Sequence, residues 1–237
     1  RSTPAVGPQT GPVLTQVTFD VGLTGDPALS PDGRMLAYAS DRSGEEHLDI
    51  WVQQLAGGEP LRLTRDAGDD SQPASSPDGT TIVYRSERDG GGLYTVPTLG
   101  GQSRFLARQG RFPRYSPDGK LISFWIGNPT GNVGTRGASR LSVVPAGGGE
   151  PRQVAIEFHA PFPAEWADSK HLIFGGLMAK GSDFLRDVWV LPVNGGDAVA
   201  TGLPQSLEKQ GVHANLLQPL SRRGERRFVW PVIQANT

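Results

Sequence analysis

Short apolar runs recur along the chain, each bounded by turns that are rich in glycine and proline. Residues 35–40, 81–86 and 121–126 are three such runs, and each carries an aromatic side chain at the same offset. Runs of this length between turn residues are typical of β-strands. Glycine and proline account for 32 and 20 of the 237 residues, so long helices are not expected.

An internal repeat places one tetrapeptide, Ser-Pro-Asp-Gly, in front of each of these runs. It begins at Ser30, Ser76 and Ser116, and weaker copies begin at Trp166 and Ser221. The starting positions are therefore 46, 40, 50 and 55 residues apart. A four-stranded blade of a β-propeller needs about 40 to 50 residues. The repeat predicts an all-β propeller of four-stranded antiparallel blades, with five units detected.

Strand signals fill the first four units in the same order, with a glycine pair between the third and fourth strands. The expected strands are 27–30, 35–40, 49–55 and 61–64; 73–76, 81–86, 93–98 and 103–107; 113–116, 121–126, 140–145 and 152–155; and 163–166, 171–175, 187–193 and 198–201. The fifth unit shows only two strands, 214–220 and 227–233. We expect residues 13–18 to supply the outer strand of the last blade, because ring closure removes an exposed sheet edge. Residues 1–12 are expected to be a linker, and residues 13–237 a single propeller domain whose last blade is incomplete.

The tetrapeptide has a structural explanation. In a type I turn the serine can bond nearby backbone, the proline fixes φ, the aspartate fits the third position and the glycine accepts a left-handed conformation at the fourth. We therefore assign the repeated Ser and Asp side chains to the turns and expect no catalytic role for them.

Charge and cysteine content narrow the possible partners. Lys and Arg number 23 against 24 Asp and Glu, which leaves a formal net charge of −1. No global field favours nucleic acid, so no nucleic-acid partner is expected. The absence of cysteine excludes disulfides, thiolate metal sites and cysteine nucleophiles. No stretch approaches the roughly 18 to 20 apolar residues of a spanning helix, so we expect no direct membrane insertion of this segment.

The phrase Asp26-Pro27-Ala28-Leu29-Ser30-Pro31-Asp32-Gly33 and its repeats resemble the PD40 repeat of TolB-type, WD40-like β-propellers. Ser40-Asp41-Arg42-Ser43-Gly44 and Asp49-Ile50-Trp51-Val52 are further similar to propellers of bacterial membrane-anchored Ser/Thr kinases and regulators. The resemblance implies six blades as the alternative to the five units detected. It further implies a binding or sensor module on the periplasmic or extracellular side of a membrane-anchored protein. It also implies a kinase or regulator domain upstream in the same chain.

Alternating strand direction puts the Ser-Pro-Asp-Gly turns and the glycine-pair turns on one face of the ring and the irregular connections on the other. Binding residues usually lie on irregular loops held by a rigid scaffold. We therefore expect a protein or peptide partner on this second face and at the channel mouth, where an uneven charge distribution could orient it. Ordinary solvated loop charges are the alternative. The candidate binding residues are Asp26, Asp41, Arg42, Asp66, Asp70, Arg88, Arg111, Arg114 and Arg136.

Metal binding has little support in the sequence. The four histidines lack the spacing of a zinc site. Asp66, Asp69 and Asp70 could offer carboxylate oxygens to Ca²⁺, but the run lacks the full ligand set of a calcium loop. We predict no metal and no cofactor.

Enzymatic function is the competing hypothesis. The chain has no Gly-x-Ser-x-Gly nucleophile motif, no phosphate-binding loop and no dinucleotide fingerprint, so we assign no catalytic residue. A propeller glycosidase or lyase would need two carboxyl groups about 5 to 9.5 Å apart, and Asp26 or Glu165 could reach the channel. The gating propeller of a serine peptidase is a further alternative.

Overall fold

The computed structural model describes residues 16–19, 22–127, 139–180 and 183–209, together with the backbone of four short strands between residues 212 and 234. Blade 1 contains β1 (Thr24–Leu29), β2 (Met35–Ser40), β3 (Asp49–Gln54) and β4 (Leu61–Arg62). Blade 2 contains β5 (Asp70–Ser75), β6 (Thr81–Ser86), β7 (Gly92–Pro97) and β8 (Arg104–Arg108). Blade 3 contains β9 (Arg111–Tyr115), β10 (Leu121–Gly127), β11 (Ser139–Pro145) and β12 (Arg152–Val154). Blade 4 contains β13 (Phe158–Pro161), β14 (Glu165–Trp166), β15 (His171–Lys180), β16 (Asp183–Pro192) and β17 (Val199–Ala200).

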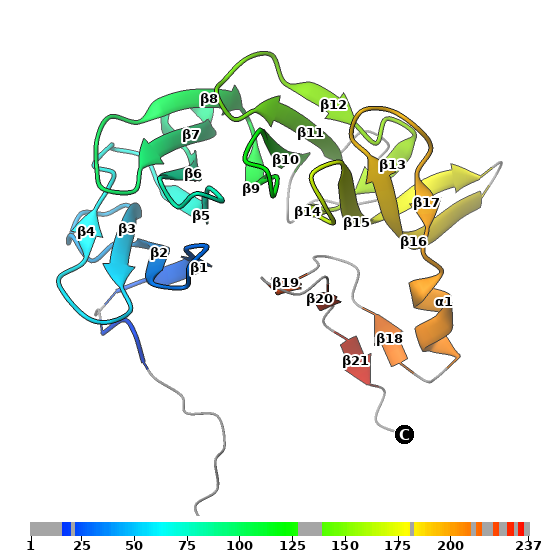
Figure 1. The fold of residues 1–237 in the computed structure, drawn as a ribbon, viewed down its shortest axis with the longest axis horizontal. Helices are drawn as coiled ribbons and strands as arrows, with labels where there is room; N and C mark the ends of the chain where they lie inside the picture. Colours follow the sequence, from blue (N-terminus) through cyan, green and yellow to red (C-terminus); the bar gives the residue numbers. More distant parts are fainter. Residues whose placement is uncertain are drawn as a thin grey trace, which may run out of the picture.

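The four blades lie side by side along an arc, in chain order (Figure 1). Every strand pairing is antiparallel, and in blades 1 to 3 the strands are neighbours in chain order. The hydrophobic cores lie between blades: Ile50 and Val52 of blade 1 pack with Ile82 and Val96 of blade 2. Similar clusters join blade 2 to blade 3 and blade 3 to blade 4. Sheets that bury their faces against neighbouring sheets around an arc form the predicted β-propeller.

The repeated turn has the predicted geometry. Ser30 O accepts the Gly33 N–H at 3.0 Å, and Ser30 Oγ donates to Asp32 Oδ1 at 2.6 Å. Equivalent bonds form after Ser76 and after Ser116, with Oγ to carboxylate distances of 2.6 and 2.7 Å. The three turn glycines have φ values of +69°, +73° and +72°. The Ser and Asp side chains are therefore turn components, as predicted.

The first strand of blades 1 to 3 begins two or three residues earlier than predicted, because each contains a β-bulge. The residue before the strand's proline is left-handed in all three: φ is 51° at Asp26, 55° at Gln72 and 50° at Phe112. The pairing register shifts at each of these places. The predicted strands 27–30, 73–76 and 113–116 each start at this proline, which cannot donate to a ladder. In the structure the proline lies within the bulge, where no ladder hydrogen bond is needed from it, and strand pairing continues on its N-terminal side.

Blade 4 and the segment after it differ more from the prediction. Strands β15 and β16 pair over ten residues each, well beyond the expected 171–175 and 187–193, and β13 is an additional strand paired with the extended part of β15. A short helix, α1 (Leu203–Glu208), occupies a region expected to be loop. The fifth unit shows four short strands in two pairs, β18 with β21 and β19 with β20, in place of the two predicted. Their bounds are Val212–Ala214 (β18), Leu220–Arg222 (β19), Arg227–Val229 (β20) and Val232–Gln234 (β21).

The predicted N-terminal closing strand is wrong in the part that can be compared. Residues 16–18 form no strand. Residues 13–15 and the proposed linker, 1–12, lie outside the described residues. No helix in the described ranges has the length and apolar character needed to cross a membrane.

Candidate functional site

A hollow lies between blades 1 and 2, reaching the face opposite the repeated turns. Its volume is about 720 Å³. It is lined by Asp66, Ala67, Arg88, Asp89, Gly91, Tyr94, Ser103, Phe105 and Arg108. A second hollow of about 370 Å³ shares Asp66, Arg88 and Ser103 with the first and continues along the end of β4 to Gly101 and Gln102. We call the two together the interblade groove.

Arg88 is held in the centre of this groove by three groups. Its guanidinium carbon lies 3.6 Å from the centre of the Tyr94 ring, and Nη1 forms an ion pair with Asp66 of blade 1. Nη2 donates to the Tyr84 hydroxyl at 3.2 Å, and that hydroxyl in turn donates to Ser103 Oγ at 2.7 Å. The sequence-predicted residues Asp66 and Arg88 therefore do meet, as an ion pair across two blades.

Phe105 and Arg108 provide the exposed part of the groove. Phe105 is 52% exposed and meets the buried Tyr94 edge to face, with ring centres 5.4 Å apart. The Arg108 guanidinium lies 5.9 Å from the centre of the Phe105 ring. Within the described part of the chain, no carboxylate lies in ion-pair contact with Arg108. Sequence reasoning missed Phe105, because nothing local marks it as an exposed aromatic side chain.

Asp70, predicted as a rim residue, is completely buried at the start of β5. Burial raises the pKa of its carboxyl to about 6, although the Ser86 and Thr64 hydroxyls and Arg88 act in the opposite direction. Neither carboxylate oxygen makes a hydrogen bond of ordinary geometry. The prediction that Asp70 faces a partner is therefore wrong. Asp70 is the first residue of strand β5, and its side chain points into the protein interior.

Asp41 and Arg42 occupy in blade 1 the place that Glu87 and Arg88 occupy in blade 2. Arg42 Nη1 donates to the Tyr38 hydroxyl at 2.9 Å, and its guanidinium lies 4.9 Å from the Trp51 ring centre. The arrangement of a tyrosine, an arginine and a second aromatic ring is thus repeated in both blades. Only the copy in blade 2 contributes residues to the lining of the two hollows. The Asp41 amide donates to Leu23 O at 3.2 Å, which fixes the loop at that point.

Asp26, Arg111 and Arg114 lie on the inner strands β1 and β9, and their hydrogen bonds join neighbouring blades. Asp26 Oδ2 accepts the Gln72 N–H at 3.0 Å, and Gln72 Oε1 accepts the Phe112 N–H at 2.8 Å, so the three bulges are linked in series. Arg111 Nη2 donates to Glu87 Oε1 at 3.1 Å, which is also held by Arg85. Arg136 lies outside the described residues.

Arg114 binds Glu165, the second carboxylate that was considered for catalysis. Its Nε donates to Glu165 Oε1 at 2.7 Å, and the Glu165 side chain is only 10% exposed. Asp26 and Glu165 come from β1 and β14, the inner strands of blades 1 and 4, with two blades between them in the arc (Figure 1). They do not form the close carboxylate pair that a glycosidase needs.

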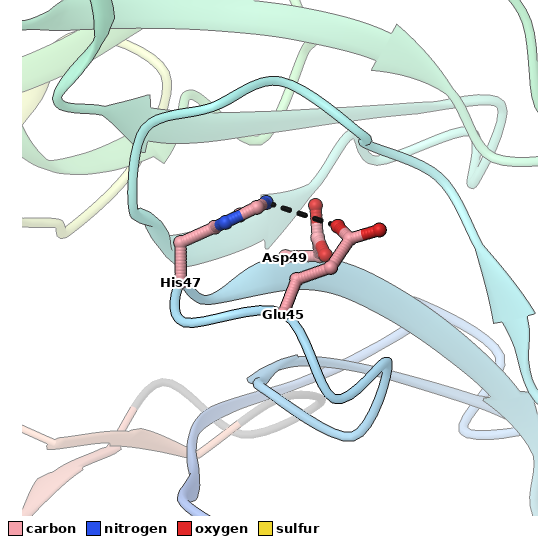
Figure 2. Close-up of side chains that lie close together, drawn as sticks. All are labelled: Glu45, His47 and Asp49. Carbon is pink, nitrogen blue, oxygen red and sulfur yellow. Dashed lines mark ion pairs between the residues drawn. The ribbon is translucent and has the colours of Figure 1, made fainter.

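One group of potential metal ligands exists among the described residues. Glu45, His47 and Asp49 bring their ligand atoms within 4.8 Å of one another, and Figure 2 shows the three side chains converging. Arg62 Nη2 lies 2.6 Å from Asp49 Oδ2 and also forms an ion pair with Glu45. Arg62 of β4 already supplies the positive charge that a metal ion would bring to these carboxylates. The cluster therefore acts as a structural contact that holds the loop between β2 and β3 against β4. Sequence reasoning did not single out this cluster, because Glu45 and His47 lie in an irregular loop whose bends bring them to Asp49.

The three aspartates considered for Ca²⁺ do not converge. Asp66 pairs with Arg88, Asp69 Oδ1 accepts the Leu48 N–H at 2.9 Å, and Asp70 is buried in β5. Each carboxylate is therefore directed to a different part of the boundary between blades 1 and 2.

The PD40 family model, described as the TolB beta propeller domain, matches residues 10–149. No curated protein sequence matches the chain. Among solved structures, TolB from Acinetobacter baumannii is 20% identical over 73% of this chain and 44% of its own, with a TM-score of 0.49. Puromycin hydrolase is 19% identical over 78% of this chain and 29% of its own, with a TM-score of 0.59. Oligogalacturonate lyase from Vibrio parahaemolyticus is 14% identical over 84% and 57%, with a TM-score of 0.57. The matched region is less than two thirds of each of these proteins, and such identities support the fold alone.

Proposed function

Because the chain belongs to the PD40 family of TolB β-propeller domains, we propose that it is a non-enzymatic binding or sensor module that recognises a protein or peptide partner. The interblade groove is the observation that carries this proposal. It lies between two blades and contains Arg108 and Phe105. Arg108 makes no ion pair with a described residue, and half of the Phe105 side chain is exposed to solvent. Exposed Arg and aromatic side chains are the types enriched at protein interfaces.

The location and wider architecture are part of the same proposal. The resemblance to outward-facing propellers supports an extracytoplasmic module of a larger membrane-anchored protein, with residues 1–12 as the linker to that protein. The relatives include proteins named as hydrolase and lyase, so catalysis is the outcome that the experiments must exclude. Asp26 and Glu165 favour binding over catalysis, because each is already engaged by a neighbouring blade.

Site-specific photocrosslinking of the full-length protein in its native cells tests the binding role. A photoreactive aromatic amino acid replaces Phe105 in one variant and Leu99 in the other. Leu99 is the matched control: it is an exposed apolar residue of the same blade, 85% exposed, in the turn between β7 and β8. We expect one discrete adduct from position 105 and none from position 99. Equal adducts from both positions, or none from either, would contradict the proposal.

An activity assay tests the competing function. The purified protein is incubated with polyuronides, neutral glycans and short peptides. We expect no turnover. Turnover that disappears in both Asp26→Asn and Glu165→Gln would establish an enzyme and overturn the binding proposal.

A further inference from the structure

We infer that the interblade groove binds an extended acidic peptide segment in which an apolar or aromatic side chain adjoins a carboxylate. This inference rests on the proposed binding function and names the chemistry of its partner. Three features of the groove carry it: an uncompensated positive charge, an exposed aromatic surface beside that charge, and the open edge of a strand.

The charge of the groove favours an anionic ligand. Its lining contains three arginines, at positions 65, 88 and 108, and two aspartates, at positions 66 and 89. Asp66 and Arg88 neutralise each other as an ion pair. The remaining charged residues of the lining are Arg65, Arg108 and Asp89, which leaves one positive charge in excess. Arg108 makes no ion pair with any described residue. A guanidinium with free donors is well suited to a carboxylate, because two parallel N–H groups can bind its two oxygens.

The aromatic surface adds an apolar requirement. Phe105 is half exposed, yet its ring is fixed by edge-to-face contact with Tyr94, which is itself covered by Arg88. A ring that is already ordered loses little side-chain entropy when a ligand covers it. Because the Arg108 guanidinium lies beside this ring, an apolar group and a carboxylate can be bound next to each other.

Strand β8 distinguishes a peptide from other carboxylate ligands. It is the outermost strand of blade 2, in the order β5-β6-β7-β8, and no described strand pairs with its outer edge. An extended peptide can hydrogen-bond to such an edge while alternate side chains enter pockets. The groove follows the same strand from the Arg108 end towards Gly101 and Gln102. An acidic sugar could use Arg108 and Phe105 but would leave the strand edge unpaired.

Calorimetric titration with defined probes tests the inference. The first probe is an N-acetylated, C-amidated pentapeptide, Gly-Glu-Phe-Glu-Gly, and the second is its neutral counterpart, Gly-Gln-Phe-Gln-Gly. We expect the acidic probe to bind at least tenfold more tightly than the neutral one. Arg108→Gln and Phe105→Ala should each weaken the acidic probe at least fivefold, whereas Arg108→Lys should retain part of the affinity. Arg34→Gln is the matched control, because Arg34 is an exposed arginine in the opposite turn, and it should leave binding unchanged.

Several results would overturn the inference. Equal affinity for the acidic and neutral probes would exclude charge recognition, and an unchanged affinity in Arg108→Gln would exclude this groove. Binding of a trigalacturonate probe in place of the peptide would assign the groove to an acidic sugar. If the crosslink at position 105 forms but neither peptide binds, the binding function stands and this inference fails. If the crosslink is also absent, both fail. Thermal unfolding of each variant checks that it remains folded.

Discussion

The two faces of the propeller arc differ in how far their interactions repeat. On the turn face, the same serine-to-aspartate hydrogen bond closes the turn in blades 1, 2 and 3, with lengths of 2.6, 2.6 and 2.7 Å. On the opposite face, even a repeated constellation diverges: Arg42 and Arg88 each cover an aromatic ring, yet only Arg88 lines the groove. The repeat therefore specifies the scaffold, and departures from it mark where binding can be specific.

The difference implies opposite responses to mutation. A turn-face change removes bonds that hold a blade together, so it lowers stability without a direct effect on the groove. A change at the boundary under the groove can raise stability, because natural binding sites often retain strained or poorly satisfied groups.

Asp70→Asn gives the largest expected effect. The folded-state pKa of Asp70 is about 6, compared with 3.8 for an ordinary aspartate. The folded protein therefore holds this proton more tightly, and stability is lost as the pH rises from about 4 to 6. A shift of about two pKa units corresponds to roughly 3 kcal/mol. Relative to the parent, the asparagine variant should gain about 2 to 3 kcal/mol in unfolding free energy between about pH 4 and pH 7.5.

Denaturant unfolding at both pH values measures this change. Asp69→Asn is the matched control, because Asp69 is an exposed neighbour that accepts the Leu48 amide. It should show no comparable gain at the higher pH. A parent-to-variant difference that does not change with pH would show that Asp70 is not the destabilised carboxylate described here.

Ser76→Ala is expected to have the next largest effect. The buried Ser76 hydroxyl donates to Asp78 and accepts the Thr81 N–H at 3.0 Å. Its removal leaves a partly buried amide without that acceptor, which should cost about 2 kcal/mol. Equilibrium unfolding measures the loss, and acidic-probe affinity should stay constant in the folded variant. Ser43→Ala serves as control, since the Ser43 hydroxyl makes only a long 3.4 Å contact on the surface. Equal losses in the two variants would contradict a special role for the turn serine.

Much of the scaffold could be predicted from the sequence because turn chemistry is local. Ser, Pro, Asp and Gly in a row specify one backbone path, so the second strands of the first two blades were placed to the residue, Met35–Ser40 and Thr81–Ser86. The β-bulges were missed because they depend on register with a neighbouring strand. The length of the β15–β16 hairpin was missed because its outer half packs with β13, an element with no repeat signature.

The site was less predictable because its contacts join distant parts of the chain. Arg114 and Glu165 are 51 residues apart, and Asp26 and Gln72 are 46 apart. Residue type alone indicated that Arg114, Glu165 and Asp26 carry charge, but could not show which residues they contact. Asp66 and Arg88 were both predicted on the loop face, but their ion pair across two blades was not predicted.

Gly33→Val tests the turn geometry with a smaller expected effect. Gly33 has a φ of +69° and nothing within 4 Å of an added Cβ, so backbone strain is the whole cost. A β-branched residue in the left-handed region should lower stability by roughly 1 to 2 kcal/mol. Gly25→Val is the matched control, because Gly25 also has open space but no positive φ and lies in strand β1. It should be neutral or slightly stabilising by thermal unfolding. An unchanged melting temperature in Gly33→Val would contradict the turn assignment.

Arg34→Gln is expected to have the smallest effect and gives the sharpest contrast between the faces. The closest carboxylate, Asp32, lies 3.9 Å from Arg34 Nε, and the two side chains are 85% and 57% exposed. Water and salt screen such a pair, so it contributes little to folding. The variant should melt at the parent's temperature at both low and high salt. A clear loss of stability would show that charge on the turn face contributes to the scaffold. The two faces could then no longer be separated into one that stabilises the fold and one that binds, because arginines would be important on both faces.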